Sequence, residues 1–268
     1  MLATLAICTL RPTGPISLGH VMSVRRNNHF IPEASLLGPI KKHVLVRECR
    51  RRVPLALLNP EMDAGNVSMS DLASQICNQI ASIFAKPTSP YPPALDLILT
   101  ELTTVASRKG RVFLYGVGRE GLMLKALCMR LFHLGLSAHF VFDMTTPPIS
   151  SNDLFVASAG PGGFSTVDAL CSVARSQGAR VLLLTAQPKS GSSVKHASVV
   201  AYLPAQTMAD DAANSEEGEG GEIGRALLPM GSVYEGAMFV LFEMVIFKLG
   251  EVLRENPEDV RARHTNLE

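Results

Sequence analysis

The sequence predicts an α/β fold in which a doubly wound, five-stranded parallel sheet is flanked by helices. Short, almost continuously apolar runs alternate with helix-like stretches from residue 70 onward, and such runs are typical of parallel strands covered on both faces. Glycine-rich turns follow the first and the third run. Ligands of such sheets bind beyond the carboxyl ends of the strands, so these turns are the expected site.

Size, charge and cysteine content exclude several classes of protein. A chain of 268 residues with 47% hydrophobic side chains suits one domain of ordinary size with appendages. A net charge of +1 gives no extended basic field for nucleic acid, whereas a small anionic ligand remains open. The five cysteines are scattered without a CxxC pair, so we expect a reducing compartment, no disulfide framework and no metal site. No apolar run reaches the roughly 18 residues of a membrane span.

Residues 1–68 form a basic extension. The first 60 residues hold nine Lys and Arg against two acidic residues, a composition typical of organelle transit peptides. A transit peptide would direct the chain to a plastid or mitochondrion. A disordered tail without a targeting signal fits this composition equally well, and the protein would then be cytoplasmic. A third alternative is that translation starts at Met69, just before an N-cap-like Ser70.

Residues 69–268 are predicted to form the folded domain. Apolar residues at helical spacing predict a first helix over about 72–84, and prolines separate it from a second at about 94–108. Later helices are clearest at 122–134, at 166–177 and, as a long apolar helix, at about 230–253, with Pro257 opening a short polar end piece. The five expected strands are 112–115, 139–142, 154–157, 181–184 and 199–202.

An acidic segment, 206–224, interrupts the pattern before the long helix. Its six acidic residues stand among small residues, which is typical of a solvated, mobile loop. A cation site is the alternative, although the glutamates lack an ordered ligand spacing.

The first glycine-rich turn, GVGREG at 116–121, runs from the first strand directly into a helix. Glycines such as Gly116 and Gly118 let the backbone approach a ligand, and the N–H groups at a helix start attract anions such as phosphate. The turn departs from the dinucleotide fingerprint because its third glycine comes one position too early. A tight strand-to-helix turn without a ligand is the alternative.

The second turn, SAGPGGFST at 158–166, follows the third strand. It offers backbone amides and hydroxyls for a phosphate, and the candidate binding residues are Gly160, Gly162, Gly163, Ser165 and Thr166. The alternative is that Pro161 and Gly162 form an ordinary turn while Ser165 caps the helix. A third polar turn, with Thr185 and residues 188–193, follows the fourth strand.

Two candidate proton carriers lie near the carboxyl end of the chain. Glu235 stands near the start of the last long helix among apolar residues, where desolvation would raise its pKa and suit a base that returns its proton. The helix start opposes that shift, and a surface residue complementing the helix dipole is the alternative. His264, in RARHTNLE, is either a proton carrier or a solvated tail residue.

Together these residues resemble the sugar isomerase (SIS) domain family, most closely its 6-phospho-3-hexuloisomerase group, over almost all of residues 71–268. The resemblance rests on several blocks in the same order: GRVFLYGVGREG, KALCMRLFHLG, PMGSVYE and PEDVRARHTNLE. It implies a five-stranded parallel sheet with extra N-terminal helices. It also implies a homo-oligomer, a dimer or tetramer, whose small-molecule partner is a sugar phosphate.

The resemblance further implies an activity that interconverts a 3-hexulose 6-phosphate and fructose 6-phosphate without metal or organic cofactor. Glu235 matches the base that moves a proton through an enediol, and His264 matches a histidine that reaches a neighbouring subunit's pocket. Arg119 matches an arginine suited to an anionic substrate or the enediolate. The alternative function is a non-catalytic phosphosugar-binding regulatory module.

Two departures from the family's pattern bear on the phosphate. The chain has Glu120 where relatives usually have serine, and a carboxylate there would repel phosphate unless it points outward. The second turn has Pro161, Gly163 and Phe164 where relatives alternate serines with glycines, so Ser165, Thr166 and the backbone amides would have to compensate.

Overall fold

The computed structural model describes residues 67–210 and 227–267. The predicted extension 1–68 lies almost entirely outside the described residues, as does most of the acidic segment 206–224. The described helices are α1 (Met69–Ile83), α2 (Ala94–Ser107), α3 (Gly118–His133), α4 (Ser165–Ser176), α5 (Ser232–Leu253) and α6 (Pro257–Ala262). The strands are β1 (Val112–Gly116), β2 (Ala138–Phe140), β3 (Leu154–Ser158), β4 (Arg180–Thr185) and β5 (Val199–Tyr202).

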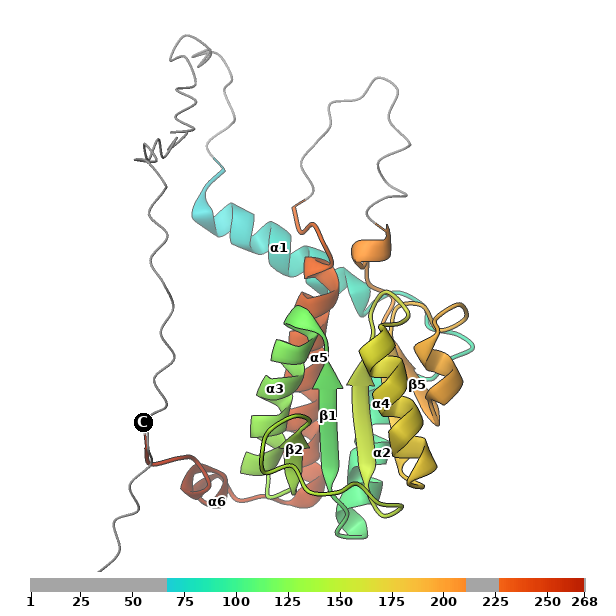
Figure 1. Cartoon of the computed structure of the whole chain (residues 1–268). Helices are drawn as coiled ribbons and strands as arrows, with labels where there is room; N and C mark the ends of the chain where they lie inside the picture. Colours follow the sequence, from blue (N-terminus) through green and yellow to red (C-terminus); the bar gives the residue numbers. More distant parts are fainter. Residues whose placement is uncertain (1–66, 211–226, 268) are drawn as a thin grey trace, which may run out of the picture. The chain divides into compact units, whose positions relative to one another are not determined.

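The sheet has five strands in the order β2-β1-β3-β4-β5, and every pair is parallel. The predicted fold class is therefore confirmed (Figure 1). The chain leaves β1 toward β2 on one side, then returns to place β3 on the other side of β1. The strand order thus reverses between β1 and β3, and a crevice for a ligand is expected where their carboxyl ends diverge.

Alternate strand residues supply two separate cores. In β1 and β3, Val112, Leu114, Leu154 and Val156 face one core, which α2, α3 and α5 cover. Their neighbours in sequence, including Phe113 and Phe155, face the other core, which α4 covers. A strand that points side chains to both faces needs apolar residues at every position when both are covered, which explains the continuous runs in the sequence.

Three predicted boundaries shift for backbone reasons. Helix α3 begins at Gly118 rather than near Leu122, because the glycines that weaken the helical pattern lie inside its first turn. Strand β2 ends at Phe140, and Phe142 has a φ of 77°, which a strand cannot accommodate. Helix α5 begins at Ser232 because Met230 and Gly231 are left-handed, with φ of 57° and 79°.

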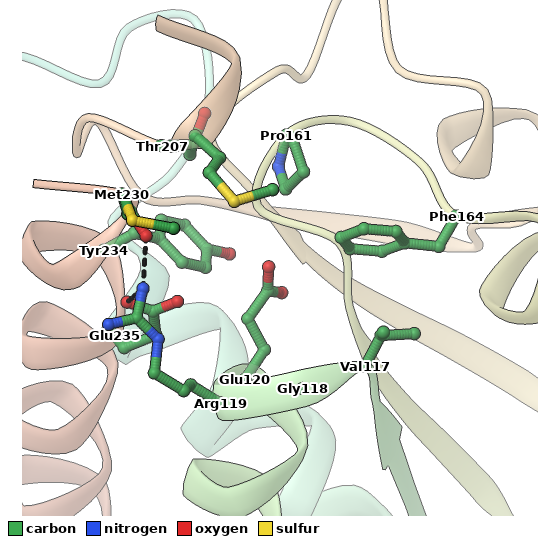
Figure 2. A pocket seen from close by; sticks show the side chains of 12 residues that line it. Val117, Gly118, Arg119, Glu120, Pro161, Phe164, Thr207, Met230, Tyr234 and Glu235 are labelled. Carbon is green, nitrogen blue, oxygen red and sulfur yellow. Dashed lines mark hydrogen bonds and ion pairs between the residues drawn. The ribbon is translucent and has the colours of Figure 1, made fainter. Parts of the chain in front are cut away.

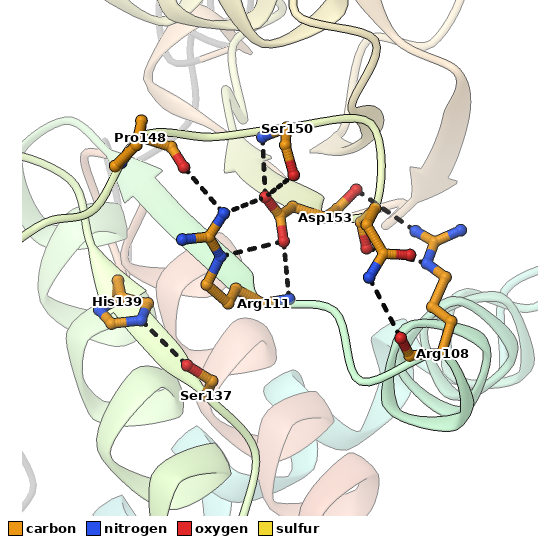
Figure 3. A network of polar contacts seen from close by, with 8 residues as sticks. Arg108, Arg111, Ser137, His139, Pro148, Ser150 and Asp153 are labelled. Atoms are coloured by element: carbon orange, nitrogen blue, oxygen red, sulfur yellow. Dashed lines mark hydrogen bonds and ion pairs between the residues drawn. The ribbon is translucent and has the colours of Figure 1, made fainter. Parts of the chain in front are cut away.

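A buried carboxylate fastens the amino ends of β1 and β3 together (Figure 3). Asp153 accepts hydrogen bonds from the backbone N–H of Arg111 at 2.9 Å and from its guanidinium Nη2 at 2.9 Å. The backbone N–H and hydroxyl of Ser150 each donate to Asp153 Oδ2 at 2.7 Å. This network holds β1 and β3 together at the end opposite the turns that follow them.

Within the described ranges, no helix has both the length and the apolar character needed to cross a bilayer. In the same ranges, no group of three or more His, Cys, Asp or Glu side chains lies close enough to hold a metal ion. The described cysteines, Cys77, Cys128 and Cys171, are free thiols.

Candidate functional site

A cavity of about 330 Å³ lies at the carboxyl edge of the sheet, where the strand order reverses (Figure 2). Four segments supply its walls: the turn into α3, the turn after β3, residues 207–208, and the start of α5 with the two residues before it. The lining residues are Val117, Gly118, Arg119, Glu120, Pro161, Phe164, Thr207, Met208, Met230, Gly231, Tyr234 and Glu235. The crevice expected from the strand order is therefore a real cavity.

Arg119 and Glu235 meet on one wall of this cavity. Nη2 of Arg119 lies 3.2 Å from Oε2 of Glu235, and Nη1 donates to the Ser232 hydroxyl at 2.9 Å. Arg119 also donates to the backbone carbonyl of Met230. Glu235 Oε2 accepts no well-directed hydrogen bond from the described residues, so Arg119 acts on it mainly through charge. The carboxylate is held in place but keeps acceptor capacity for a ligand.

The environment of Glu235 is that of a carboxylate that can exchange a proton. Its side chain is 16% exposed. Burial raises its pKa above the ordinary value, and the charge of Arg119 opposes that shift. A carboxylate with a raised pKa is a stronger base than one in water, and partial exposure lets the proton be returned.

Glu120 lies on another wall and points inward, contrary to the orientation that a phosphate at this turn would require. It is 6% exposed. Its Oε2 accepts the Ser158 hydroxyl at 2.5 Å and the Gly160 N–H at 3.0 Å. Burial raises the pKa of Glu120, the hydrogen bonds from Ser158 and Gly160 oppose this, and the nearby charge of Glu235 adds to it. The carboxylate is therefore costly to bury but well supplied with donors.

Tyr234 completes this network from the first turn of α5. Its side chain is almost fully buried, and its hydroxyl lies 3.3 Å from the Ser158 hydroxyl. Burial raises the pKa of Tyr234 well above its ordinary value, so the phenol stays protonated and can donate to Ser158. A Cβ added at Gly160 would lie 2.8 Å from the Tyr234 ring and 3.0 Å from Glu120 Oε1. Gly160 is therefore required by the close approach of these two side chains.

The predicted site residues lie at different positions relative to the cavity. Gly118, Arg119 and Glu235 line the cavity together. Gly160 lies behind it, bonded to Glu120. Gly116 lets the end of β1 pack closely against the first turn of α3, since a Cβ there would lie 3.0 Å from the backbone nitrogen of Gly121.

The other predicted binding residues of the second turn, Gly162, Gly163, Ser165 and Thr166, do not line the cavity, although Pro161 and Phe164 of the same turn do. A Cβ on Gly162 would lie 3.0 Å from Gln187 Cβ, and one on Gly163 would lie 1.9 Å from the Ser192 hydroxyl, so both glycines pack against the third turn. Ser165 and Thr166 are exposed on the first turn of α4 and are not among the lining residues. The alternative in which Ser165 caps α4 is wrong, because Phe164 holds the N-cap position without a side-chain bond.

His264 lies at the opposite end of α3 from the cavity. Its ring packs against His133, the last residue of α3, with centroids 5.1 Å apart. Gly118, the first residue of that helix, lines the cavity. Since α3 has 16 residues, the two ends are roughly 20 Å apart along the helix axis. Within one chain, the structure therefore does not bring His264 to Glu235.

Sequence reasoning missed several residues of the site. Tyr234, Thr207, Met208 and Met230 line the cavity, but no local pattern marks them as functional. Thr207 belongs to the segment predicted to be a mobile loop, yet it is 2% exposed, and its backbone N–H donates to Asp210 at 2.8 Å. The block PMGSVYE could have pointed to Met230 and Tyr234, because it contains both of them together with Glu235.

A five-stranded parallel sheet with helices on both faces and a carboxylate-lined cavity at the strand reversal define a doubly wound α/β protein with a ligand site at the carboxyl edge of its sheet. No family model matches the sequence, but curated proteins do. The chain is 36% identical over 159 residues to the 3-hexulose-6-phosphate isomerase of Mycobacterium gastri, an alignment covering 59% of this chain and 74% of that protein. It is 32% identical to the enzyme of the same name from Bacillus subtilis, over 59% of this chain and 80% of that protein.

Solved structures agree on the fold. A protein of Methanococcus jannaschii, for which a 3-hexulose-6-phosphate isomerase function was inferred from its crystal structure, superposes with a TM-score of 0.58 at 22% identity, over 73% of this chain and 98% of that one. An Escherichia coli CFT073 protein, solved in complex with a ligand, gives 0.54 at 16% identity, over 72% of this chain and 94% of that one. The chain belongs to the 3-hexulose-6-phosphate isomerase group of the SIS family, as the sequence motifs predicted.

Proposed function

We propose that this phosphosugar isomerase interconverts a 3-hexulose 6-phosphate and fructose 6-phosphate. The observation that carries the proposal is the half-buried Glu235 carboxylate, which lines the cavity beside Arg119 and has a raised pKa. Two curated relatives named for this reaction support the choice of substrate.

In the proposed mechanism, Glu235 removes the proton from C2 of the 3-hexulose. The electrons of the broken C–H bond form the C2=C3 double bond, and the C3 carbonyl oxygen becomes the enediolate oxygen. Arg119 stabilises that negative charge. A proton then moves between the two oxygens, and protonated Glu235 returns its proton to C3, which leaves the carbonyl at C2. No net oxidation occurs, so this scheme requires no redox cofactor.

His264 has a proposed role as a helper in ring opening or proton movement. Because it lies at the far end of α3 from the cavity of its own chain, we assign it to the cavity of a neighbouring copy. This assignment requires a homo-oligomer, a dimer or a tetramer. Gly118 and Arg119, which line the cavity, remain proposed substrate-binding residues, and Gly116 and Gly160 are proposed to support them. Substrate binding by Gly162, Gly163, Ser165 and Thr166 stays a prediction from the sequence, since these residues do not line the cavity.

The test is an assay with 3-hexulose 6-phosphate in which fructose 6-phosphate is followed by a coupled dehydrogenase. We expect turnover to fall at least roughly a hundredfold in Glu235→Gln, the size typical of losing a general base. Glu243→Gln is the matched control, because Glu243 lies on the same helix but pairs with Arg130 at 3.5 Å outside the cavity. Equal activity in Glu235→Gln and the unchanged chain would remove Glu235 from the mechanism.

A non-catalytic phosphosugar-binding module is the second candidate function. The inward carboxylate of Glu120, which uses donors that a phosphate could otherwise bind, favours it. In that case the unchanged chain binds fructose 6-phosphate but does not turn over 3-hexulose 6-phosphate. Measuring binding and turnover on the same preparation separates the two functions.

We also propose that the basic segment 1–68 is a transit peptide that directs the isomerase domain, residues 69–268, to a plastid or mitochondrion; the alternative is a tail without a targeting signal, which would leave the domain in the cytoplasm. Its excess of basic over acidic residues supports this. A fluorescent protein fused to residues 1–68 would enter the organelle, whereas a diffuse cytosolic signal would contradict the proposal.

A further inference from the structure

The turn after β3 already contains an anion, which is the carboxylate of Glu120. The Gly160 N–H lies 3.0 Å from Oε2 and 3.2 Å from Oε1, and the Ser158 hydroxyl donates to Oε2 at 2.5 Å. The Tyr234 hydroxyl, 3.3 Å from Ser158, is placed to donate in turn. The polar groups of this network therefore satisfy one another without any ligand.

This arrangement reverses the hydrogen-bonding character of the turn. A backbone N–H and a hydroxyl are donors suited to phosphate, but both are used by Glu120. An ionised carboxylate can only accept, and its two oxygens offer about four acceptor sites. Oε1 receives one long contact from Gly160, and Glu120 lines the cavity between Tyr234 and Phe164 (Figure 2). The turn therefore presents hydrogen-bond acceptors, and not donors, to a ligand.

The charges on the cavity wall also disfavour phosphate at this turn. Among the described lining residues, the charged side chains are Arg119, Glu120 and Glu235. Arg119 pairs with Glu235 at 3.2 Å, while Glu120 is bonded only to neutral groups. A phosphate placed against the turn would face a carboxylate that pairs with no cation of the described residues, at a buried position where charges interact strongly.

We propose that Glu120 is the specificity-determining residue of this cavity, and that it binds sugar hydroxyls at the Ser158–Gly160 turn while excluding phosphate from it. The proposal rests on the sugar-phosphate function stated above and specifies its geometry: the hydroxyl-bearing part of the ligand faces Glu120, and the phosphate binds away from that turn. Glu120 is thus a contact of the substrate and distinct from the base, Glu235.

The first test is titration calorimetry of the full chain with inorganic phosphate. In Glu120→Ser the carboxylate is gone and the turn's donors become available, so we expect phosphate to bind at least tenfold more tightly than to the unchanged chain. Glu120→Gln keeps the shape of the side chain and removes its charge, so we expect an intermediate affinity. Glu243→Gln, which removes one charge outside the cavity, should bind phosphate like the unchanged chain.

Two controls make the outcome decisive. Circular dichroism checks that each variant folds. If Glu120→Ser does not fold, the near-isosteric Glu120→Gln takes its place, and the proposal then depends on whether that variant binds phosphate more tightly than the unchanged chain. A gain below tenfold in folded Glu120→Ser, or no gain in Glu120→Gln, would overturn the exclusion of phosphate. Calorimetry measures phosphate binding without turnover, so a negative isomerase assay does not change the interpretation of this test.

The second test addresses the hydroxyl groups, using D-fructose, which carries no phosphate. Saturation-transfer NMR should detect fructose on the unchanged chain, with a signal that falls in Glu120→Ser. Absence of fructose binding to the unchanged chain, or equal binding in the variant, would overturn the assignment of hydroxyls to Glu120.

Discussion

Nη2 of Arg119 lies 3.2 Å from Oε2 of Glu235, across the gap between the first turns of α3 and α5. The guanidinium is anchored by the Ser232 hydroxyl and the Met230 carbonyl, so its position depends on the start of α5 as much as on α3. Two segments far apart in sequence thus set the proton affinity of one carboxylate.

Replacing Arg119 should shift the acid limb of the profile of activity against pH. Burial raises the pKa of Glu235 and Arg119 lowers it, so Arg119→Gln raises that pKa further. A base must be ionised to act, and activity is lost as pH falls through its pKa. We therefore expect the acid limb of kcat/KM to shift to higher pH. Arg130→Gln, whose partner Glu243 lies outside the cavity, should leave the limb in place. An unchanged or lowered limb in Arg119→Gln would contradict this account.

Asp153 should stabilise the fold above about pH 4. Burial alone would raise its pKa, but hydrogen bonds from Arg111 and Ser150 outweigh this effect and lower the pKa to about 2, from an ordinary 3.8. A carboxyl with a lowered folded-state pKa contributes stability that is present above the unfolded value and lost as pH falls toward the folded one. At neutral pH the shift corresponds to about 2 kcal/mol.

Urea unfolding of Asp153→Asn at pH 7 should therefore show a loss of about that size or more, since the variant also leaves buried donors unpaired. The loss should shrink between pH 4 and pH 2. Asp143→Asn serves as the control, because Asp143 is exposed. A loss that stays constant down to pH 2 would show that Asp153 stabilises through shape and not through its charge.

Much of the fold could be predicted because its signals are local. The runs around Leu114, Val156 and Leu183 are apolar at every position, as strands buried on both faces must be, and all five strands were found. The orientation of Glu120 could not be predicted, because it depends on β1 and β3 being neighbours at one register, Gly116 opposite Ser158. That contact joins residues 38 positions apart, and no local pattern encodes it.

The same limit applies to the second turn. Its glycines resemble a ligand-binding loop in sequence, but Gly162 and Gly163 are explained by the close packing of the third turn. Gly160 alone of the three is bonded to a residue that lines the cavity. Sequence spacing identified the turn, while only the tertiary contacts separate its packing role from a binding role.

Gly160→Ala should disrupt the buried network. The added Cβ would meet Tyr234 at 2.8 Å and Glu120 at 3.0 Å, and both side chains are held by packing, so the methyl group forces one to move. We expect a lower Tm and altered ligand binding. Gly250→Ala, in the last turns of α5, is the matched control: its Cβ would meet Leu134 at an ordinary 3.6 Å, and alanine favours a helix over glycine by about 1 kcal/mol. A variant Gly160→Ala as stable as Gly250→Ala would refute the packing requirement.

The proposed sharing of sites between subunits predicts complementation. His264 packs against His133 at the far end of α3 from its own cavity, so Glu235→Gln and His264→Ala would each disable every site of a homogeneous oligomer. In a mixed dimer with two-fold symmetry, one site carries both changes and the other carries neither. Random mixing makes half of the dimers mixed, so co-expression of the two variants should restore roughly a quarter of the activity.

Each variant expressed with a differently tagged copy of itself is the control and should stay inactive. A mixed preparation with no more activity than the two variants alone would mean that His264 does not act in the neighbouring cavity. Activity of homogeneous His264→Ala equal to that of the unchanged chain would remove His264 from the mechanism, whatever the oligomer. Both results can be obtained with the coupled assay used for Glu235→Gln, so base and helper are tested on one scale.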